Sequence, residues 1–235
     1  KSFGHQHIKD DHETLRSIFL TANGKFDQLI IDLRGNTGGE ITYWSENLLS
    51  PLLKGPVTLD VLTAVKKQYE RRMNIHLLYY RLFTSNDLLD TTANSIVSIK
   101  KTHINGLDKT DWNSYLIKKT FSPQNTFNFD GGIFILMNRD TLSAADSFVS
   151  AMKQLKLATL VGTPSGGWGN HYSQPWLFSL PNSGLTFQMD IELAYNADEL
   201  PTSIFGTQPN ILLNPSDYPG PIPADFEIET LLADP

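Results

Sequence analysis

The sequence predicts an α/β fold, and two observations lead to this prediction. Apolar runs that are too short for helices end in glycine or asparagine turns, and helical patterns follow them. The runs at 28–34 and 133–137 show this most clearly. In addition, the chain has 235 residues with a hydrophobic content of 40%, which is enough to bury a core as one large domain or two small ones.

Composition and charge exclude several functional classes. The chain carries 19 Lys and Arg against 25 Asp and Glu, so its formal net charge is −6. An acidic chain argues against a broad nucleic-acid-binding face, and no apolar run approaches the roughly 18 residues of a membrane helix. The chain has no cysteine, which excludes disulfides, thiolate catalysis and cysteine-based zinc sites. We expect no cofactor, no nucleic-acid partner and no membrane span.

The first part of the chain predicts alternating helices and strands. Leu15, Ile18 and Phe19 lie at helical spacing, and Asn23-Gly24 is a stop signal. The elements that follow are a buried strand at 28–34, a glycine loop at 35–39, a helix at 41–53 and a strand at 57–62.

Residues 63–120 differ in character, because they hold many of the Lys and Arg residues and show helical patterns with few turn signals. We interpret 63–120 as a helical insertion or cap, and 1–62 with 121–235 as the α/β core. The stripe through His76, Leu77, Tyr80 and Leu82 is expected to be a packing face.

The last part of the chain returns to alternating strands and helices before it ends in a proline-rich tail. Strands are expected at 133–137 and 157–161 with a helix at 143–155 between them, then a glycine-rich stretch at 162–169. Residues 176–180 and 185–195 are predicted to form a hairpin, and the tail from Asn196 is predicted to be mostly loop.

Ser143 opens the helix predicted after the strand at 133–137. Its ordinary role would be an N-cap, with Asp146 completing a pair similar to a capping box. The functional alternative is that its hydroxyl lies beside free backbone N–H groups at the positive end of the helix dipole, a geometry that can stabilise an oxyanion.

The glycine loop at 35–39 offers a second candidate. A strand that runs into Gly38-Gly39 exposes backbone N–H donors where no side chain crowds an incoming carbonyl. The alternative is a tight turn, with Asp32 and Arg34 as a structural pair. A phosphate loop is excluded, because no Lys-Ser/Thr follows the last glycine.

Taken together, these segments resemble the C-terminal processing (tail-specific) serine protease family, which includes the tricorn protease core. The resemblance is carried, in order, by LIIDLRGNTGG (29–39), IFILMN (133–138) with SAAD (143–146), LVGTPSGG (160–167) and FGTQPN (205–210). In the last of these, Asn210 stands where that family usually has Asp. The resemblance leaves 63–120 unexplained.

The resemblance implies a ClpP/crotonase-like core of mixed sheet and helices and a polypeptide substrate bound in extended form. It also implies Ser143 as the nucleophile and serine-type endopeptidase activity. The oxyanion hole would be the amide of Ala144 with one from Gly38 or Gly39.

The general base departs from this pattern, because Trp168 in Gly167-Trp168-Gly169 stands where the usual dyad lysine would lie. A serine hydroxyl needs a neighbour that takes its proton. His171 is the leading replacement, and His5 or His7 could act as a tricorn-type base, although that register would place the base before residue 1. Glu199 lies near the position of the tricorn orienting acid.

Several alternatives stay open at this point. The chain could be a catalytically inactive relative that binds peptides or another ligand, and it could form a homo-oligomer. It begins at Lys1 without a leader, which indicates a processed or excised segment and leaves room for an upstream domain. An extracellular or cell-envelope location is favoured. His5, His7 and His12 with neighbouring Asp residues could suggest a metal site, but no full ligand set follows at a defined spacing, so we expect none.

Overall fold

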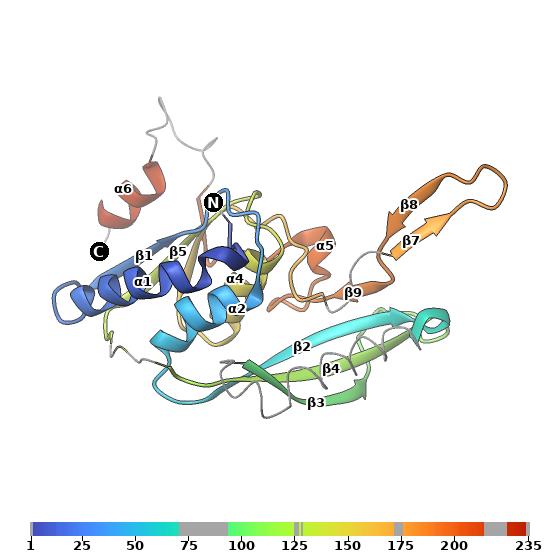
Figure 1. The fold of residues 1–235 in the computed structure, drawn as a ribbon, viewed down its shortest axis with the longest axis horizontal. Coiled ribbons are helices and arrows are strands. Elements are labelled where there is room, and N and C mark those ends of the chain that lie inside the picture. The colour runs from blue at the N-terminus through green and yellow to red at the C-terminus, as the bar shows by residue number, and fades with distance from the viewer. Residues whose placement is uncertain are drawn as a thin grey trace.

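Two different sheets organise the protein (Figure 1). The computed structural model describes residues 2–70, 94–124, 127, 129–171, 176–213 and 225–233. One sheet has four parallel strands, the other has four antiparallel strands, and a two-stranded hairpin stands apart from both. With the helices that pack on the sheets, this arrangement confirms the α/β fold class.

The parallel sheet positions the loops of the candidate site. Its strand order is β1 (Gln28–Asp32), β5 (Gly132–Met137), β6 (Thr159–Gly162) and β10 (Ile211–Leu212). Because all four strands run the same way, the loops that follow them gather at one edge of the sheet. The glycine loop after β1, the turn before Ser143 and the glycine-rich stretch after β6 therefore meet there.

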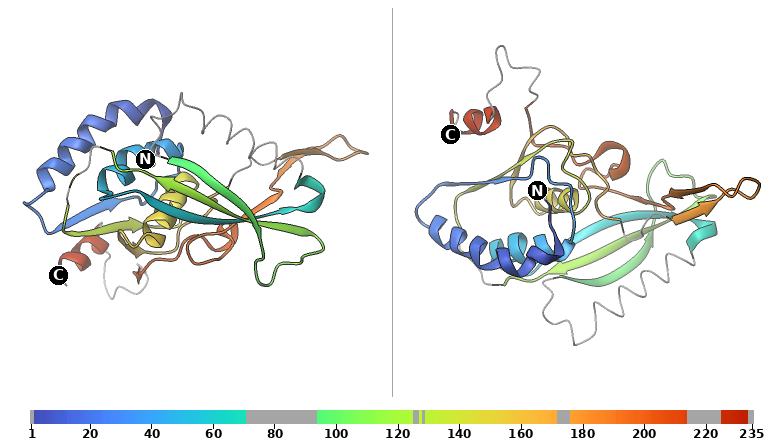
Figure 2. Two further views of the ribbon diagram at one scale, coloured as in Figure 1. Left: turned by 90° about the horizontal axis from the view of Figure 1, so that it is seen from below. Right: turned by 45° about the horizontal axis from the view of Figure 1, so that its top comes forward.

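Helices cover both faces of the parallel sheet (Figures 1 and 2). The main core joins one face of β5 and β6 to aromatic and aliphatic side chains such as Phe148 and Met152. The helices on this side are α1 (Ile8–Ala22), α2 (Ile41–Trp44) with its π and 3-10 continuation (Ser45–Leu49 and Ser50–Leu52), and α4 (Ala144–Gln154). Leu136 and Val161 on the opposite face pack against Leu231 of α6 (Phe226–Ala233).

The antiparallel sheet corrects the expected helical insertion. Its order is β3 (Asn94–Thr102), β4 (Trp112–Phe121), β2 (Val57–Lys66) and β9 (Glu192–Ala194). Much of 63–120 is therefore strand, and the helical prediction is wrong for β3 and β4. The prediction failed because charged Lys119 lies among the buried apolar residues on the inward face of β4. It interrupts the alternation of apolar and polar residues that would indicate a strand.

The residues between these strands leave part of the expectation untested. The segment 71–93, which holds the predicted packing stripe from His76 to Leu82, lies outside the described residues. The division into a core and an insertion stays a prediction.

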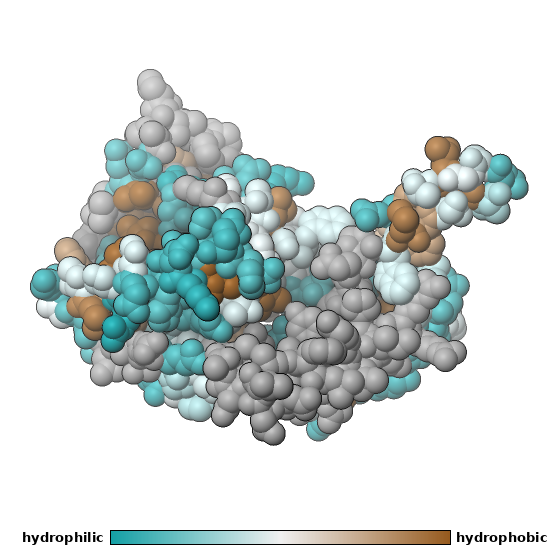
Figure 3. Space-filling model, in the orientation of Figure 1, coloured by the Kyte–Doolittle hydropathy of each residue, from teal (hydrophilic) through white to brown (hydrophobic). Residues whose placement is uncertain are grey.

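The predicted hairpin is shorter than expected and projects from the body (Figures 1 and 3). It consists of β7 (Trp176–Ser179) and β8 (Thr186–Met189), and the strand after it, β9, belongs to the antiparallel sheet. The tail contains α5 (Thr202–Phe205), β10 and α6, so the prediction of mostly loop is wrong there. Two 3-10 turns complete the elements, at His5–His7 and Lys67–Tyr69. None of the helices among the described residues is long and apolar enough to cross a bilayer.

Candidate active site

Ser143 lies exposed at the head of α4 in a strained backbone conformation. Its φ and ψ are 54° and −121°, a region that residues with a Cβ seldom occupy. Its hydroxyl makes no capping hydrogen bond, so the interpretation of Ser143 and Asp146 as a cap pair is wrong. Its amide donates to the Gly167 carbonyl at 2.8 Å, and the amide of Leu142 donates to the Asn36 carbonyl at 3.0 Å. Two loops thus hold the turn at which the exposed Ser143 lies.

The glycine bend packs directly against Ser143. Gly38 has φ +92°, and a Cβ added there would lie 2.7 Å from Ser143 Cβ and 2.8 Å from the Ala144 nitrogen. Only glycine allows the two backbones to come this close. The structure therefore brings together the two segments that the sequence singled out.

The amides at this junction are not equivalent. The Gly38 amide donates to Asn36 Oδ1 at 3.0 Å, so it is already engaged inside its own loop. The Ala144 amide belongs to the first turn of α4, where N–H groups have no acceptor within the helix. The Gly38 amide is therefore already occupied, and the assignment of the oxyanion hole to Ala144 with Gly38 or Gly39 stays a prediction.

Asp146 holds the site together in a way that sequence analysis missed, because it was assigned to a cap. It is fully buried, and its carboxylate accepts five hydrogen bonds from two other loops. Oδ1 accepts from Ser165 Oγ at 2.5 Å, Thr207 Oγ1 at 2.7 Å and Thr207 N at 3.2 Å, while Oδ2 accepts from Thr202 Oγ1 at 2.9 Å and Gly169 N at 3.0 Å. This Asp146 network ties the helix of Ser143 to the segments around 165–169 and 202–207.

The structure does not join the proposed base to the nucleophile. Trp168 has φ 66°, is 48% exposed, and stacks on the His171 ring with centroids 5.9 Å apart. Both ring nitrogens of His171 are buried without a hydrogen-bond partner, so neither bonds the Ser143 hydroxyl. Asn170 nevertheless donates its amide to Ser147 Oγ at 2.8 Å, which places the chain next to His171 one helical turn from Ser143.

The candidate acids differ from expectation. Glu199 lies exposed in a turn after β9 with φ 57°, and its amide donates to the Asn196 carbonyl. Asp190, which sequence analysis did not single out, has both carboxylate oxygens buried without a partner. Burial raises the pKa of Asp190, and the charge of His171 opposes that rise. No local sequence signal pointed to Asp190.

The N-terminal segment lies beside the glycine bend. Phe3 donates its amide to the Gly38 carbonyl at 2.7 Å, and its own carbonyl accepts from the Glu40 amide at 2.8 Å. His5 and His7 follow in an exposed 3-10 turn. These two candidate histidines follow Phe3, the residue bonded to the bend, by two and four residues.

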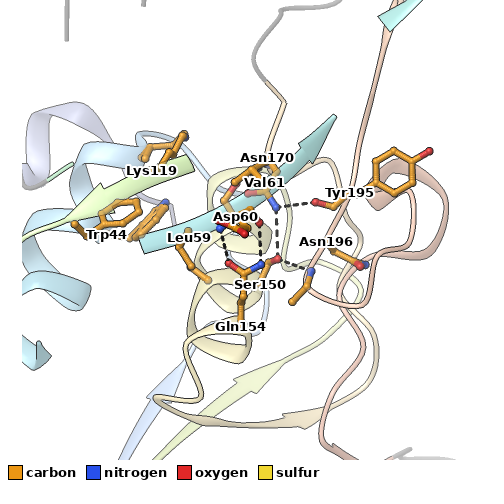
Figure 4. A pocket seen from close by; sticks show the side chains of 15 residues that line it. Trp44, Leu59, Asp60, Val61, Lys119, Ser150, Gln154, Asn170, Tyr195 and Asn196 are labelled. Atoms are coloured by element: carbon orange, nitrogen blue, oxygen red, sulfur yellow. Dashed lines mark hydrogen bonds between the residues drawn. The ribbon is translucent and has the colours of Figure 1, made fainter. Parts of the chain in front are cut away.

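A pocket lies along α4, beginning one turn beyond Ser143 (Figure 4). It is small and partly open to solvent. Its walls combine apolar side chains such as Trp44 and Phe121 with polar groups such as Ser147 and Ser150. Lys119 also lines it, and burial lowers the pKa of Lys119 to about 8, against the opposing effect of the Glu192 charge.

Comparisons with known proteins bear on the family and the fold. A family model described as "Peptidase family S41" matches residues 1–213, while no curated protein matches significantly. A structure of mature CPAF complexed with lactacystin is 20% identical with a TM-score of 0.61, over 94% of this chain and 45% of that one. The photosystem II D1 C-terminal processing protease is 15% identical with a TM-score of 0.53, over 99% and 45% of the two chains.

A third solved structure extends the fold similarity. A lipoprotein from Streptococcus agalactiae is 15% identical with a TM-score of 0.50, and the match covers 97% of this chain and 60% of that one. The chain therefore spans about half of the length of these structures. At these identities, the structural similarity shows the fold alone.

Proposed function

Because the chain belongs to peptidase family S41, we propose that it is a serine peptidase that cleaves a polypeptide through an acyl-enzyme on Ser143. The observation that carries this proposal is the exposed residue Ser143, which is held in a strained turn against the glycine bend. Backbone strain of this kind costs about 1–3 kcal/mol and persists where the surrounding structure enforces it.

In the proposed reaction, Ser143 Oγ attacks the carbonyl carbon of the scissile peptide bond and gives up its proton to a base. The amides of Ala144 and Gly39 would donate hydrogen bonds to the oxyanion that forms. The C–N bond then breaks, and the amine leaves with the proton that the base returns. Water attacks the resulting ester and restores the Ser143 hydroxyl.

For the base we propose His171, which would turn a ring nitrogen toward Ser143 when substrate binds. Catalytic hydrogen bonds are often long in free enzymes and tighten in the complex. Glu199 is the acid that the tricorn-like pattern suggests for orienting the base, and Asp190 is a second candidate because the charge of His171 acts on it.

The alternative function is a catalytically inactive member that binds polypeptides. Two observations favour it, namely Trp168 in place of the dyad lysine and the absence of a hydrogen bond between His171 and Ser143 among the described residues. In that case the site would bind an extended peptide without acylation.

A serine-directed fluorophosphonate probe separates the two functions. We expect the probe to label the wild-type protein at Ser143 and peptide mapping to locate the adduct there. Ser143→Ala should lose both labelling and casein cleavage, while Ser183→Ala, at an exposed serine of the hairpin turn, should retain both. A folded wild-type protein that neither labels nor cleaves would refute the peptidase proposal and leave the binding module.

A further inference from the structure

Trp168 is held beside the candidate nucleophile at a conformational cost. Its φ of 66° lies in a region that bulky residues seldom occupy, and 48% of its surface stays exposed. The glycines on either side of it are fixed. The Gly167 carbonyl accepts from the Ser143 amide at 2.8 Å, and the Gly169 amide donates to Asp146 Oδ2 at 3.0 Å. The surrounding structure therefore enforces an unfavourable position for this residue next to the head of α4.

The side chain of Trp168 contacts His171, the residue that we propose as the base. The two rings stack with their centroids 5.9 Å apart and their planes inclined by 24°. An aromatic pair of this kind shifts an equilibrium by about threefold to tenfold beyond the effect of the area that it buries. The stack therefore favours the orientation of His171 that the structure shows.

His171 gains no hydrogen bond in this orientation. Both of its ring nitrogens are buried without a partner, and so are both carboxylate oxygens of Asp190. Each unsatisfied buried polar group disfavours a conformation by about fivefold or more. The two groups are close enough for the charge of His171 to act on Asp190. An imidazole that turned in this space would satisfy Asp190 with one nitrogen and leave the other for a second partner.

The Ser143 hydroxyl is the second partner that the chemistry requires. The chain before His171 follows the first turn of α4, because the Asn170 amide donates to Ser147 Oγ at 2.8 Å. Ser147 and Ser143 are one helical turn apart, or about 5.4 Å along the axis. The backbone at Asn170 is therefore anchored near the nucleophile, and the orientation of the His171 side chain decides whether the imidazole faces it.

We propose that Trp168 is a positioning residue: its stack holds His171 in a resting orientation, and the imidazole turns to Ser143 when the stack opens. This role rests on the proposed function, because it takes His171 as the base and Ser143 as the nucleophile. Trp168 stands where the dyad lysine would lie, but it takes no proton. It sets the fraction of molecules in which the base is in place, and the reactivity of Ser143 is reduced by that fraction.

The first test compares the rates at which a fluorophosphonate probe labels Ser143. Trp168→Ala removes the ring, whereas Trp168→Phe keeps an aromatic face for His171, and both variants keep the Cβ and the backbone cost that comes with it. We expect labelling to be about threefold to tenfold faster in Trp168→Ala than in the wild type. Trp168→Phe should label at the wild-type rate. The matched control Phe26→Ala, at an aromatic residue that is 60% exposed in the loop after α1, should do the same.

The second test shows whether the effect acts through His171. Trp168→Ala combined with His171→Ala should label no faster than His171→Ala alone. Diethyl pyrocarbonate, which modifies accessible imidazole nitrogens, gives a measurement that is independent of catalysis. Mass spectrometry should show His171 modified about threefold to tenfold faster in Trp168→Ala than in the wild type or Trp168→Phe, with exposed His5 as the internal standard.

The outcomes separate this inference from the peptidase proposal. Equal labelling of Ser143 in the wild type and Trp168→Ala leaves the peptidase proposal intact and overturns the positioning role. Faster labelling that persists without His171 also overturns it. If no variant is labelled, the peptidase proposal fails, and modification by diethyl pyrocarbonate then decides whether the stack restrains His171: equal rates overturn the inference and a faster rate in Trp168→Ala supports it. If Trp168→Ala does not fold, Trp168→Leu, which also lacks an aromatic face, replaces it with the same expectations.

Discussion

Replacing Gly38 with alanine places a methyl group where the glycine bend meets the candidate nucleophile. The new Cβ would lie 2.6 Å from the Leu142 carbonyl oxygen, 2.7 Å from Ser143 Cβ and 2.8 Å from the Ala144 nitrogen. Ordinary contact begins at 3.4 Å, so the bend and the head of α4 must separate by about 0.6–0.8 Å. A shift approaching 1 Å in a catalytic arrangement costs about 10²-fold in rate.

Gly35→Ala is the matched control for this substitution. Gly35 also has a positive φ of +70°, but a Cβ there meets nothing within 4 Å. Both variants therefore pay a backbone cost of about 1–2 kcal/mol, while only Gly38→Ala disturbs Ser143. We expect fluorophosphonate labelling of Ser143 to slow about 10²-fold in Gly38→Ala and to stay within about threefold in Gly35→Ala, with unfolding in urea as the measure of stability. Equal labelling rates in the two variants would refute the reasoning.

Two further predictions concern buried charges. Asp146→Asn should lower the free energy of unfolding by about 3 kcal/mol or more, because the amide cannot satisfy five donors that now share one carboxylate; an unchanged urea midpoint would contradict this. Burial lowers the pKa of Lys119 to about 8 from 10.5. Between pH 8 and pH 10.5 the unfolded chain therefore binds more protons than the folded protein. The free energy of unfolding of the wild type should then rise with pH across this range, by up to about 3 kcal/mol. Lys119→Met should lack that rise, and parallel pH profiles of the two proteins would show that the Lys119 charge is not buried as described.

The part of the fold that local patterns encode could be predicted from the sequence. The strands at 28–34 and 133–137 and the helix at 143–155 are continuous apolar or helical stretches between clear turn signals, and β1, β5 and α4 lie there. The proximity of Gly38 and Ser143 was also accessible, because parallel strands bring their following loops to one edge. The structure thus confirms the elements that local patterns indicate directly.

The remainder depends on contacts between distant residues. β4 was missed because Lys119 faces the interior and breaks the apolar alternation. The role of Asp146 was missed because its partners Ser165 and Thr207 come from loops that lie 19 and 61 residues away. No sequence signal indicated that the Gln154 side chain hydrogen-bonds the backbone of Asp60, because an exposed glutamine near a helix end is ordinary.

The strain at Ser143 and the Asp146 network bear on whether the protein is an enzyme or a catalytically inactive binding module. A serine with φ 54° is unfavourable by about 1–3 kcal/mol relative to an ordinary conformation, and the bond to Gly167 from one loop and the contact with Gly38 from another hold it there. The Asp146 network fixes the loop that contains Gly167 by bonds to Ser165 and Gly169 on either side. A protein that only binds an extended backbone gains nothing from presenting one hydroxyl in a strained turn, whereas a nucleophile requires a fixed position close to oxyanion donors. This cost is most simply understood if Ser143 attacks a carbonyl, which is why labelling of Ser143 is the first experiment to perform.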